Sequence, residues 1–405
     1  MNTRFTQNKT ILKLVDQIPK NKQYSDIVDA EGNQYVDLVQ EGGGVLGIAL
    51  VGYTYILEKA GIRFISLAGT SAGAINTIMM AGLGRLEDTK SEKILDILNR
   101  QNLFDLVDGH SSIKKIINKA IKKEKGLIWS LIWSAGRIFR TMKQKLGLNP
   151  GSYFEAWITK ELSQNSIHTL KDLIELRKIL PNGLRNVEDG GDITDIDPKL
   201  AIISSDITTH TKAKFPKMAK LYWSNPDIIS PAKLVRASMS IPFFFEPYQV
   251  SNIPNVGVFN DSNWNEFAGY SGPVPPKVKF VDGGMLSNFP INVFHRKDGG
   301  IPRMPTFGVR LSTYREKYSK TDSFLRLNSA MINTMRQIHD YDFLLKNKDY
   351  KHLICRINAD EKFNWLDFNM SEEDKIKLFN LGAEKAIEFL KKFDWIAYKK
   401  IRAEN

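Results

Sequence analysis

The sequence predicts an α/β fold of three layers, α/β/α, in which helices cover both faces of a mostly parallel central sheet. Apolar runs at 35–39 and 64–68 have the length of buried strands, and each precedes a glycine-containing turn and a segment with helical spacing. This strand–helix–strand–helix order favours two parallel strands that lie side by side. The 405 residues are 42% hydrophobic and 25% charged, a composition typical of a globular protein.

The first helix of this unit is expected over 48–61, where Gly61 ends it, and the second over 72–81. Further short apolar runs predict strands at 200–206, at 277–281, at 306–311 and around Cys355. Helices are expected at 234–242, where Pro242 ends the first, at 323–348 and at 371–400. No strand is expected between 84 and 180, and the acidic stretch 188–197 indicates a solvated loop.

Three parts of the chain are distinguished by composition. Residues 1–34 are polar and predict a peripheral arm with a short helix near 10–16. Residues 35–312 are predicted as one catalytic domain, interrupted by a helical, basic cap insertion at about 84–180. Residues 313–405 are predicted as a mainly helical extension packed on the same domain.

Charge and cysteine content restrict the partners and the compartment. The formal charge of +12 indicates an anionic partner, which a membrane surface, a nucleotide or a nucleic acid would provide. Cys355 is the single cysteine, so no intrachain disulfide is possible and a cytoplasmic protein is expected. The first twenty residues lack the apolar core of a signal peptide, and no apolar run has the length of a membrane span.

Ser71 is the candidate nucleophile. It lies in the sequence Gly69-Thr70-Ser71-Ala72-Gly73, between a predicted strand and a predicted helix, and a chance turn of small residues is the alternative reading. On such a sharp turn the small neighbours leave the serine hydroxyl exposed. The helix N-terminus also favours a developing negative charge there.

The glycine run Gly42-Gly43-Gly44 follows the first predicted strand, one strand–helix unit before the serine turn. Three successive glycines expose backbone N–H groups without side chains in the way, which an oxyanion hole requires. An ordinary flexible turn is the alternative. We expect amides of Gly42, Gly43, Gly44 and Ala72 to face the substrate oxyanion.

Asp282 is the candidate general base. It ends a predicted apolar strand and is followed by Gly283 and Gly284. None of the six histidines follows a strand in a loop of small residues, so a histidine base is disfavoured. Partial desolvation would raise the basicity of a carboxylate in this position, which would let it accept the serine proton directly.

These blocks, together with Arg236-Ala237-Ser238 and Pro242-Phe243, resemble the patatin-like phospholipases, in particular the bacterial patatin-like acyl hydrolases, in order and approximate spacing. The resemblance covers roughly 35–312. It implies the three-layer fold, a Ser71/Asp282 dyad without histidine, and hydrolysis of lipid acyl esters without a metal or cofactor. Many members carry Arg or Lys in the glycine loop where this chain has Leu46, so any charge that residue lends the oxyanion or the lipid phosphate is missing or comes from elsewhere.

The segment 113–147 carries ten basic residues against one acidic residue and has apolar residues at helical spacing. Its candidates for membrane or anion binding are Lys122, Lys123, Trp129, Trp133, Arg137 and Arg140. A cap packed on the sheet and an interfacial membrane helix are both compatible with this pattern. Peripheral membrane contact is therefore expected when the enzyme is active.

Several alternatives remain at this stage. A histidine-using esterase or thioesterase on soluble acyl esters is the main one. The family also includes bacterial toxins and antiviral effectors switched on by cyclic nucleotides, so an activating nucleotide, a homo-oligomer or secretion without a classical signal peptide is a second possibility. A nucleic-acid-binding module has no supporting motif or aromatic platform.

Overall fold

The computed structural model describes residues 3–112, 114–115, 119, 140–255, 257–296, 298–313, 318–336 and 338–404. Its strands are β1 Ile27–Val28, β2 Gln34–Gln40, β3 Ile62–Thr70, β4 Gly147–Asn149, β5 Arg185–Asn186, β6 Leu200–Asp206, β7 Thr211–Phe215, β8 Phe243–Phe245, β9 Tyr248–Ser251, β10 Lys277–Asp282, β11 Thr306–Arg310 and β12 Ile354–Arg356.

The α-helices are α1 Thr3–Thr6, α2 Lys9–Val15, α3 Gly47–Lys59, α4 Ala72–Gly82, α5 Ser91–Arg100, α8 Ser152–Ser163, α9 Leu170–Lys178, α10 Ala232–Ser238, α11 Gly257–Ala268, α12 Phe324–Met335, α13 Ile338–Lys346, α14 Glu372–Lys392 and α15 Trp395–Ala403. Short 3₁₀ turns are η1 Gly44–Leu46, η2 Leu103–Leu106, η3 Ala219–Leu221, η4 Pro226–Ile228, η5 Gly283–Met285, η6 Ile291–Phe294, η7 Lys348–Leu353 and η8 Ala359–Glu361.

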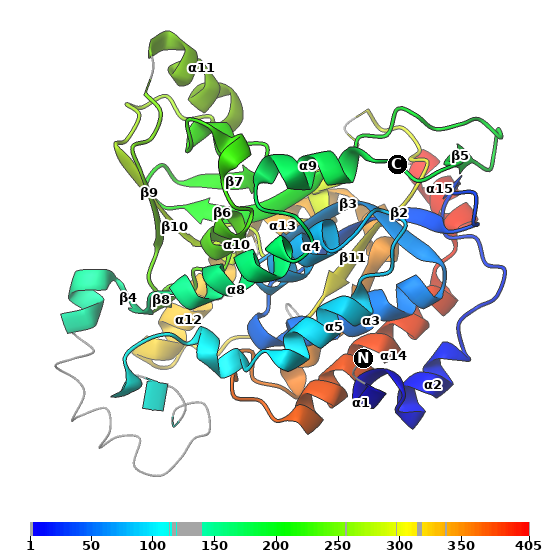
Figure 1. Ribbon diagram of the computed structural model, residues 1–405, viewed down its shortest axis with the longest axis horizontal. Helices are drawn as coiled ribbons and strands as arrows, with labels where there is room; N and C mark the ends of the chain where they lie inside the picture. The colour runs from blue at the N-terminus through cyan, green and yellow to red at the C-terminus, as the bar shows by residue number, and fades with distance from the viewer. Residues whose placement is uncertain are drawn as a thin grey trace.

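The main sheet has the strand order β12-β11-β2-β3-β6-β10-β9 (Figure 1). Strands β12, β11, β2, β3 and β6 are parallel, whereas β10 at one edge pairs antiparallel with both β6 and β9. The predicted mostly parallel sheet is therefore confirmed, and so is the pairing of the two strands that precede the glycine loop and the serine turn. The strand at 277–282 belongs to the antiparallel edge.

Neighbouring residues of β11 show that the sheet is covered on both faces. Phe307 packs on Phe389 and Phe393 at the C-terminal end of α14, with ring centroids 4.9 Å apart in each pair. A Cβ placed on Gly308 would lie 2.6 Å from Phe289 and 2.7 Å from Ile291, on the loop and the short turn η6. Because successive residues of a strand point to opposite faces, these contacts belong to two separate layers.

Helix α3 packs against both β3 and α14, and most of its side chains are buried. A helix that is apolar all round needs partners on every side. Two glycines bring the backbones of α3 and α14 together: a Cβ on Gly52 would lie 2.0 Å from the Phe379 carbonyl oxygen, and one on Gly382 would lie 1.9 Å from that of Ala49. The C-terminal helix therefore completes the layer that supports the glycine loop.

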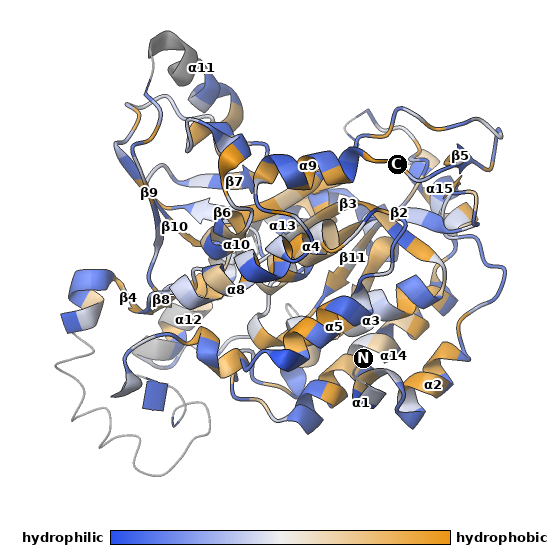
Figure 2. Ribbon diagram, in the orientation of Figure 1, coloured by the Kyte–Doolittle hydropathy of each residue, from blue (hydrophilic) through white to orange (hydrophobic). Residues whose placement is uncertain are grey.

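The N-terminal segment packs on α14 as well. Phe5 of α1 meets Phe379 edge to face, with centroids 5.7 Å apart, and the Asn8 amide donates to the Asn380 side-chain oxygen at 3.2 Å. Figure 2 shows hydrophobic residues on the central strands and on α4, whereas the loop that carries β5 is mostly polar. The acidic stretch 188–197 lies in this loop and is largely exposed, as predicted.

Two local expectations were wrong. Residues 147–149 form the short strand β4, which pairs in parallel with β8, although no strand was expected between 84 and 180. Three residues are too few for a periodicity to reveal a strand. Helix α10 ends at Ser238, four residues before Pro242. Within the described ranges, every helix is too short or too polar to span a bilayer.

Candidate active site

Ser71 lies on the turn between β3 and α4 with φ 52° and ψ −117°. A non-glycine residue with this positive φ is strained, and such strain persists where the surroundings impose it. The close approach of the two turns leaves no room for side chains beside the serine, because a Cβ on Gly73 would lie 2.4 Å from the Gln40 carbonyl oxygen. Ser71 is thus held at the N-terminus of α4, as the sequence predicted.

Ser238 holds the backbone of the serine turn. The Ser71 N–H donates to the Ser238 hydroxyl oxygen at 2.9 Å, and that hydroxyl donates to the Ile203 carbonyl at 2.5 Å. The sequence block around Arg236 was recognised, but no role was assigned to its serine. Its function depends on contact between α10, β6 and the turn, which are far apart in the chain.

We predict that Ser238→Ala lowers kcat by about 10- to 100-fold with little change in KM, because the unsatisfied Ser71 amide would displace the nucleophile. The matched control is Ser204→Ala, since the buried Ser204 hydroxyl has no hydrogen-bond partner among the described residues. Steady-state kinetics on one ester substrate measures both. Equal activity of the two variants would contradict a positioning role for Ser238.

The register of the sheet places Asp282 close to Ser71. Thr70 pairs with Ile203 and Asp282 pairs with Ser204, so β6 brings the end of β10 level with the serine turn. The Ser71 side chain lies close enough to the Asp282 carboxylate to lower the pKa of that carboxyl. One Asp282 carboxylate oxygen also accepts a hydrogen bond from the Gly284 N–H at 2.7 Å.

The electrostatic surroundings of Asp282 have opposing effects. Burial raises the pKa of its carboxyl above the usual value of 3.8, while the charge of Arg336 and the hydrogen bonds from Ser71 and Gly284 lower that pKa in part. Burial is the largest effect, so the carboxylate is more basic than an exposed aspartate. It can therefore accept a proton from a hydroxyl in contact with it.

The glycine loop differs in one respect from its prediction. The Gly42 N–H donates to the Asn288 carbonyl oxygen at 3.0 Å and has no second hydrogen to offer, so Gly42 does not fit as an oxyanion donor. Gly43 and Gly44 line the cavity beside Ser71, and no partner for their N–H groups is found in the described part of the chain. Ala72 is the first residue of α4, where an N–H has no partner within the helix.

Glu41 and Asn288 fasten this loop. The buried Glu41 carboxylate accepts from the backbone N–H groups of Leu311 and Ser312 at 2.6 and 2.9 Å. The Asn288 amide donates to the Gly42 carbonyl at 3.2 Å, and its side-chain oxygen accepts from Arg336 at 2.8 Å. Sequence reasoning assigned no role to Glu41, Asn288 or Arg336. Of these three residues, only Glu41 lies at a position that the sequence distinguishes, because it directly precedes the glycine run.

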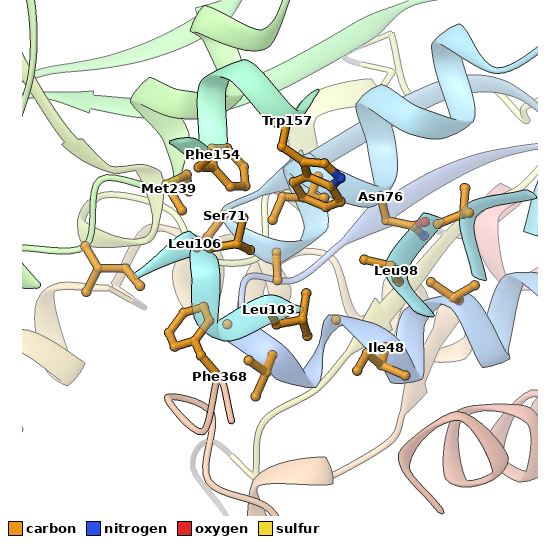
Figure 3. A pocket seen from close by; sticks show the side chains of 18 residues that line it. Ile48, Ser71, Asn76, Leu98, Leu103, Leu106, Phe154, Trp157, Met239 and Phe368 are labelled. Atoms are coloured by element: carbon orange, nitrogen blue, oxygen red, sulfur yellow. The ribbon is translucent and has the colours of Figure 1, made fainter. Parts of the chain in front are cut away.

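Two cavities meet at Ser71, because Gly44, Ser71 and Ile241 line both. The first, which we call the apolar cavity, extends between α3, α4, α5 and α8 and includes Phe154 and Trp157 (Figure 3). Its polar side chains are Ser71 and Asn76, and the amide of Asn76 is held by Gln40 at 2.6 Å. With a volume of about 60 Å³, it is narrow in this structure.

The second cavity, which we call the Asp282 cavity, has a volume of about 450 Å³. It contains Asp282 and Arg336, and apolar side chains from β4, β8, α12 and the segment after η8 form much of its remaining wall: Leu148, Ile241, Pro242, Phe243, Phe244, Met285, Ile332, Trp365 and Leu366. Phe243 is 64% exposed at this wall. Leu46 is buried in the core and lines neither cavity.

The candidates for membrane or anion binding are only partly covered by the structure. Lys122, Lys123, Trp129, Trp133 and Arg137 lie outside the described residues. Arg140 is exposed at the start of a helical stretch over 140–145.

Among the described residues, no histidine lines either cavity, and no group of three or more His, Cys, Asp and Glu side chains could hold a metal ion. The carboxylate of Asp282 is thus the basic group in contact with Ser71.

Three comparisons with known proteins place this chain among relatives. The family model described as Patatin-like phospholipase matches residues 38–295. An uncharacterized protein of Bacillus subtilis (strain 168), YqhO, is 29% identical over 371 residues, which are 89% of this chain and 100% of that protein. The crystal structure of VipD from Legionella pneumophila is 14% identical with a TM-score of 0.41, and the match covers 94% of this chain and 73% of that one.

Proposed function

Since this chain belongs to the patatin-like phospholipase family, whose members hydrolyse lipid esters, we propose that it cleaves fatty-acyl esters of membrane phospholipids by a Ser71/Asp282 dyad. One observation carries the proposal: a serine on a strained turn lies beside a buried aspartate in the wall of one cavity, at the point where a second, apolar cavity meets it. The apolar cavity suits an acyl chain, and the Asp282 cavity suits the remainder of the lipid.

In the first step, the Asp282 carboxylate accepts the Ser71 proton while the serine oxygen attacks the ester carbonyl carbon. The resulting oxyanion accepts hydrogen bonds from the N–H groups of Gly43 and Gly44, and from that of Ala72 at the helix N-terminus. The tetrahedral intermediate then breaks its bond to the alcohol oxygen. Asp282 returns the proton to that oxygen, and a lysophospholipid leaves.

In the second step, water attacks the acyl-enzyme. Asp282 accepts a proton from this water, the fatty acid leaves, and the proton returns to Ser71. The raised pKa of Asp282 suits both transfers, because a more basic carboxylate is the better acceptor. No histidine is required, in contrast to an esterase of the Ser/His type.

A direct test combines labelling with product analysis. We expect a fluorophosphonate to modify Ser71, as shown by peptide mass spectrometry, and the enzyme to release fatty acid and lysophospholipid from phospholipid vesicles. A short soluble ester such as p-nitrophenyl butyrate provides the comparison. Cleavage of the soluble ester without release from vesicles would favour the alternative of an esterase on soluble substrates.

The role of the apolar cavity predicts a change in chain-length preference. Leu98 of α5 lines this cavity and lies away from Ser71 (Figure 3). A larger side chain there should obstruct a long acyl chain but not a short one. We expect Leu98→Phe to lower the ratio of 16-carbon to 4-carbon ester hydrolysis by about tenfold.

Both esters are measured with the same protein sample, so the ratio of their hydrolysis rates does not depend on folding or on the amount of active enzyme. Leu98→Ala, which widens the same position, should leave the ratio unchanged or raise it. If Leu98→Phe keeps the wild-type ratio, the acyl chain does not enter the apolar cavity.

A further inference from the structure

Arg336 is a cation in the wall of the Asp282 cavity. It follows α12 directly, and Ile332 and Asn333 of that helix line the same cavity. Leu148 of β4 and Phe243 and Phe244 of β8 line the same cavity. Arg336 thus contributes a positive charge to a cavity whose other charged lining side chain is Asp282.

The guanidinium is held in place without being neutralised by direct contact. One of its nitrogens donates to the Asn288 side-chain oxygen at 2.8 Å, and the Asn288 backbone N–H donates to the Arg336 carbonyl at 3.2 Å. Within the described ranges, no carboxylate lies within 4 Å of it, whereas Arg310 is 3.7 Å from Glu41. An oriented cation without a direct counter-ion in a largely apolar wall is suited to an anionic ligand.

Its position relative to the dyad suits an anion close to the scissile ester. The guanidinium passes near the turn after Asp282, since a Cβ built on Gly284 would lie 3.3 Å from one of its nitrogens. Its charge also acts on Asp282 through space. In a glycerophospholipid, the phosphate is attached to the same glycerol as the acyl esters, so an anion a few bonds from the scissile ester is a feature of the substrate.

The glycine loop supplies no comparable charge. Position 46 is a leucine buried in the core, and Val45 beside it is buried as well. Arg336 lies outside residues 38–295, which the family model matches, so its role does not follow from family membership. A cation from the C-terminal extension is therefore what the Asp282 cavity offers to an anion.

We propose that Arg336 binds the phosphodiester of the lipid substrate and thereby selects phospholipids over neutral acylglycerols. This inference rests on the proposed function. A planar guanidinium can donate two parallel hydrogen bonds to phosphate oxygens, and Asn288 orients it for this contact. An ester without phosphate lacks this contact and reacts through the dyad alone.

The test compares two substrates with identical acyl chains, phosphatidylcholine and diacylglycerol, dispersed in the same neutral detergent micelles. Arg336→Gln should lower kcat/KM for phosphatidylcholine by about 10- to 100-fold and change that for diacylglycerol by less than about threefold. Arg336→Lys should restore part of the loss, because it retains the charge but not the bidentate geometry.

The matched control is Arg326→Gln, in the same helix. Arg326 is exposed and pairs with Asp322 at 2.7 Å, and it does not line the cavity. It should leave both activities unchanged. Rates are compared on the plateau of each pH profile, because loss of the Arg336 charge also raises the pKa of Asp282 and moves the acidic limb of both profiles to higher pH.

The outcomes separate this inference from the proposed function. If wild type hydrolyses both lipids and Arg336→Gln slows both equally, Arg336 acts on the dyad and the phosphate assignment is wrong. If Arg336→Gln slows neither, Arg336 has no role in the reaction. If wild type releases fatty acid from neither, the proposed function fails.

A binding measurement tests the site independently of turnover. Ser71→Ala should bind monomeric dihexanoylphosphatidylcholine more tightly than the double variant Ser71→Ala/Arg336→Gln, as measured by calorimetry. Inorganic phosphate in place of the lipid distinguishes the two sources of the anion. If inorganic phosphate binds Ser71→Ala as tightly as the lipid does, the site binds free phosphate and the lipid assignment is wrong. If both variants bind the lipid equally, Arg336 does not bind it.

Discussion

Ser71→Ala is expected to lower fatty-acid release from phospholipid vesicles by about 10³- to 10⁶-fold. The change removes the oxygen that forms the acyl-enzyme, and water attacking directly would lack the positioned nucleophile. The expected fold of the variant is unchanged, because alanine keeps the Cβ and the Ser71 N–H still donates to Ser238. Mass spectrometry of the released fatty acid measures the loss. As a second readout, a fluorophosphonate should no longer modify the variant at position 71.

The thermal midpoint of this variant is the control for folding, and it should lie within a few degrees of wild type. Wild-type turnover by a well-folded Ser71→Ala protein would exclude Ser71 as the nucleophile.

Asp282→Asn is expected to lower hydrolysis by about 10³- to 10⁴-fold while making the protein more stable at neutral pH. An amide cannot accept the Ser71 proton, which explains the loss of activity. Its oxygen still accepts a hydrogen bond, so the bond from the Gly284 N–H can be retained. The gain in stability follows from burial, which disfavours the ionised carboxylate in the folded state.

The sign of the stability effect depends on pH. The pKa of Asp282 is raised in the folded protein, so its protonated form stabilises the fold below the unfolded pKa, and this contribution is lost as pH rises through the folded pKa. At pH 7 the ionised group therefore costs stability. The thermal midpoint of Asp282→Asn should exceed that of wild type by about 1–3 °C at pH 7, and the difference should shrink toward pH 4.

The same raised pKa predicts that the activity of the wild-type enzyme falls toward acidic pH, with the midpoint of this fall above pH 3.8.

The matched control for Asp282→Asn is Asp189→Asn. The Asp189 carboxylate accepts a hydrogen bond from the Gly191 N–H, two residues later, at 2.9 Å, but Asp189 lies in an exposed loop. This variant should keep the wild-type activity and the wild-type thermal midpoint. An Asp282→Asn protein with full activity would exclude Asp282 as the base.

The sequence by itself determined the parts of this protein that depend on local pattern. Strand lengths, helical spacing and glycine placement predicted β2, α3, β3 and α4, and hence the parallel pairing that brings the glycine loop beside the serine turn. The same signals predicted Ser71, the glycine loop and Asp282 as candidate site residues, because turns of small residues after apolar strands are visible without any tertiary information.

Tertiary structure alone decided which groups complete the site. The Gly42 N–H is occupied by Asn288, Ser71 is fastened by Ser238, and the charge beside Asp282 comes from Arg336, more than fifty residues further along the chain. No periodicity encodes these contacts, since each joins residues that are far apart in the sequence. The physical reason is that a side chain's hydrogen-bond partner depends on packing, whereas the element it occupies depends largely on its neighbours in the sequence.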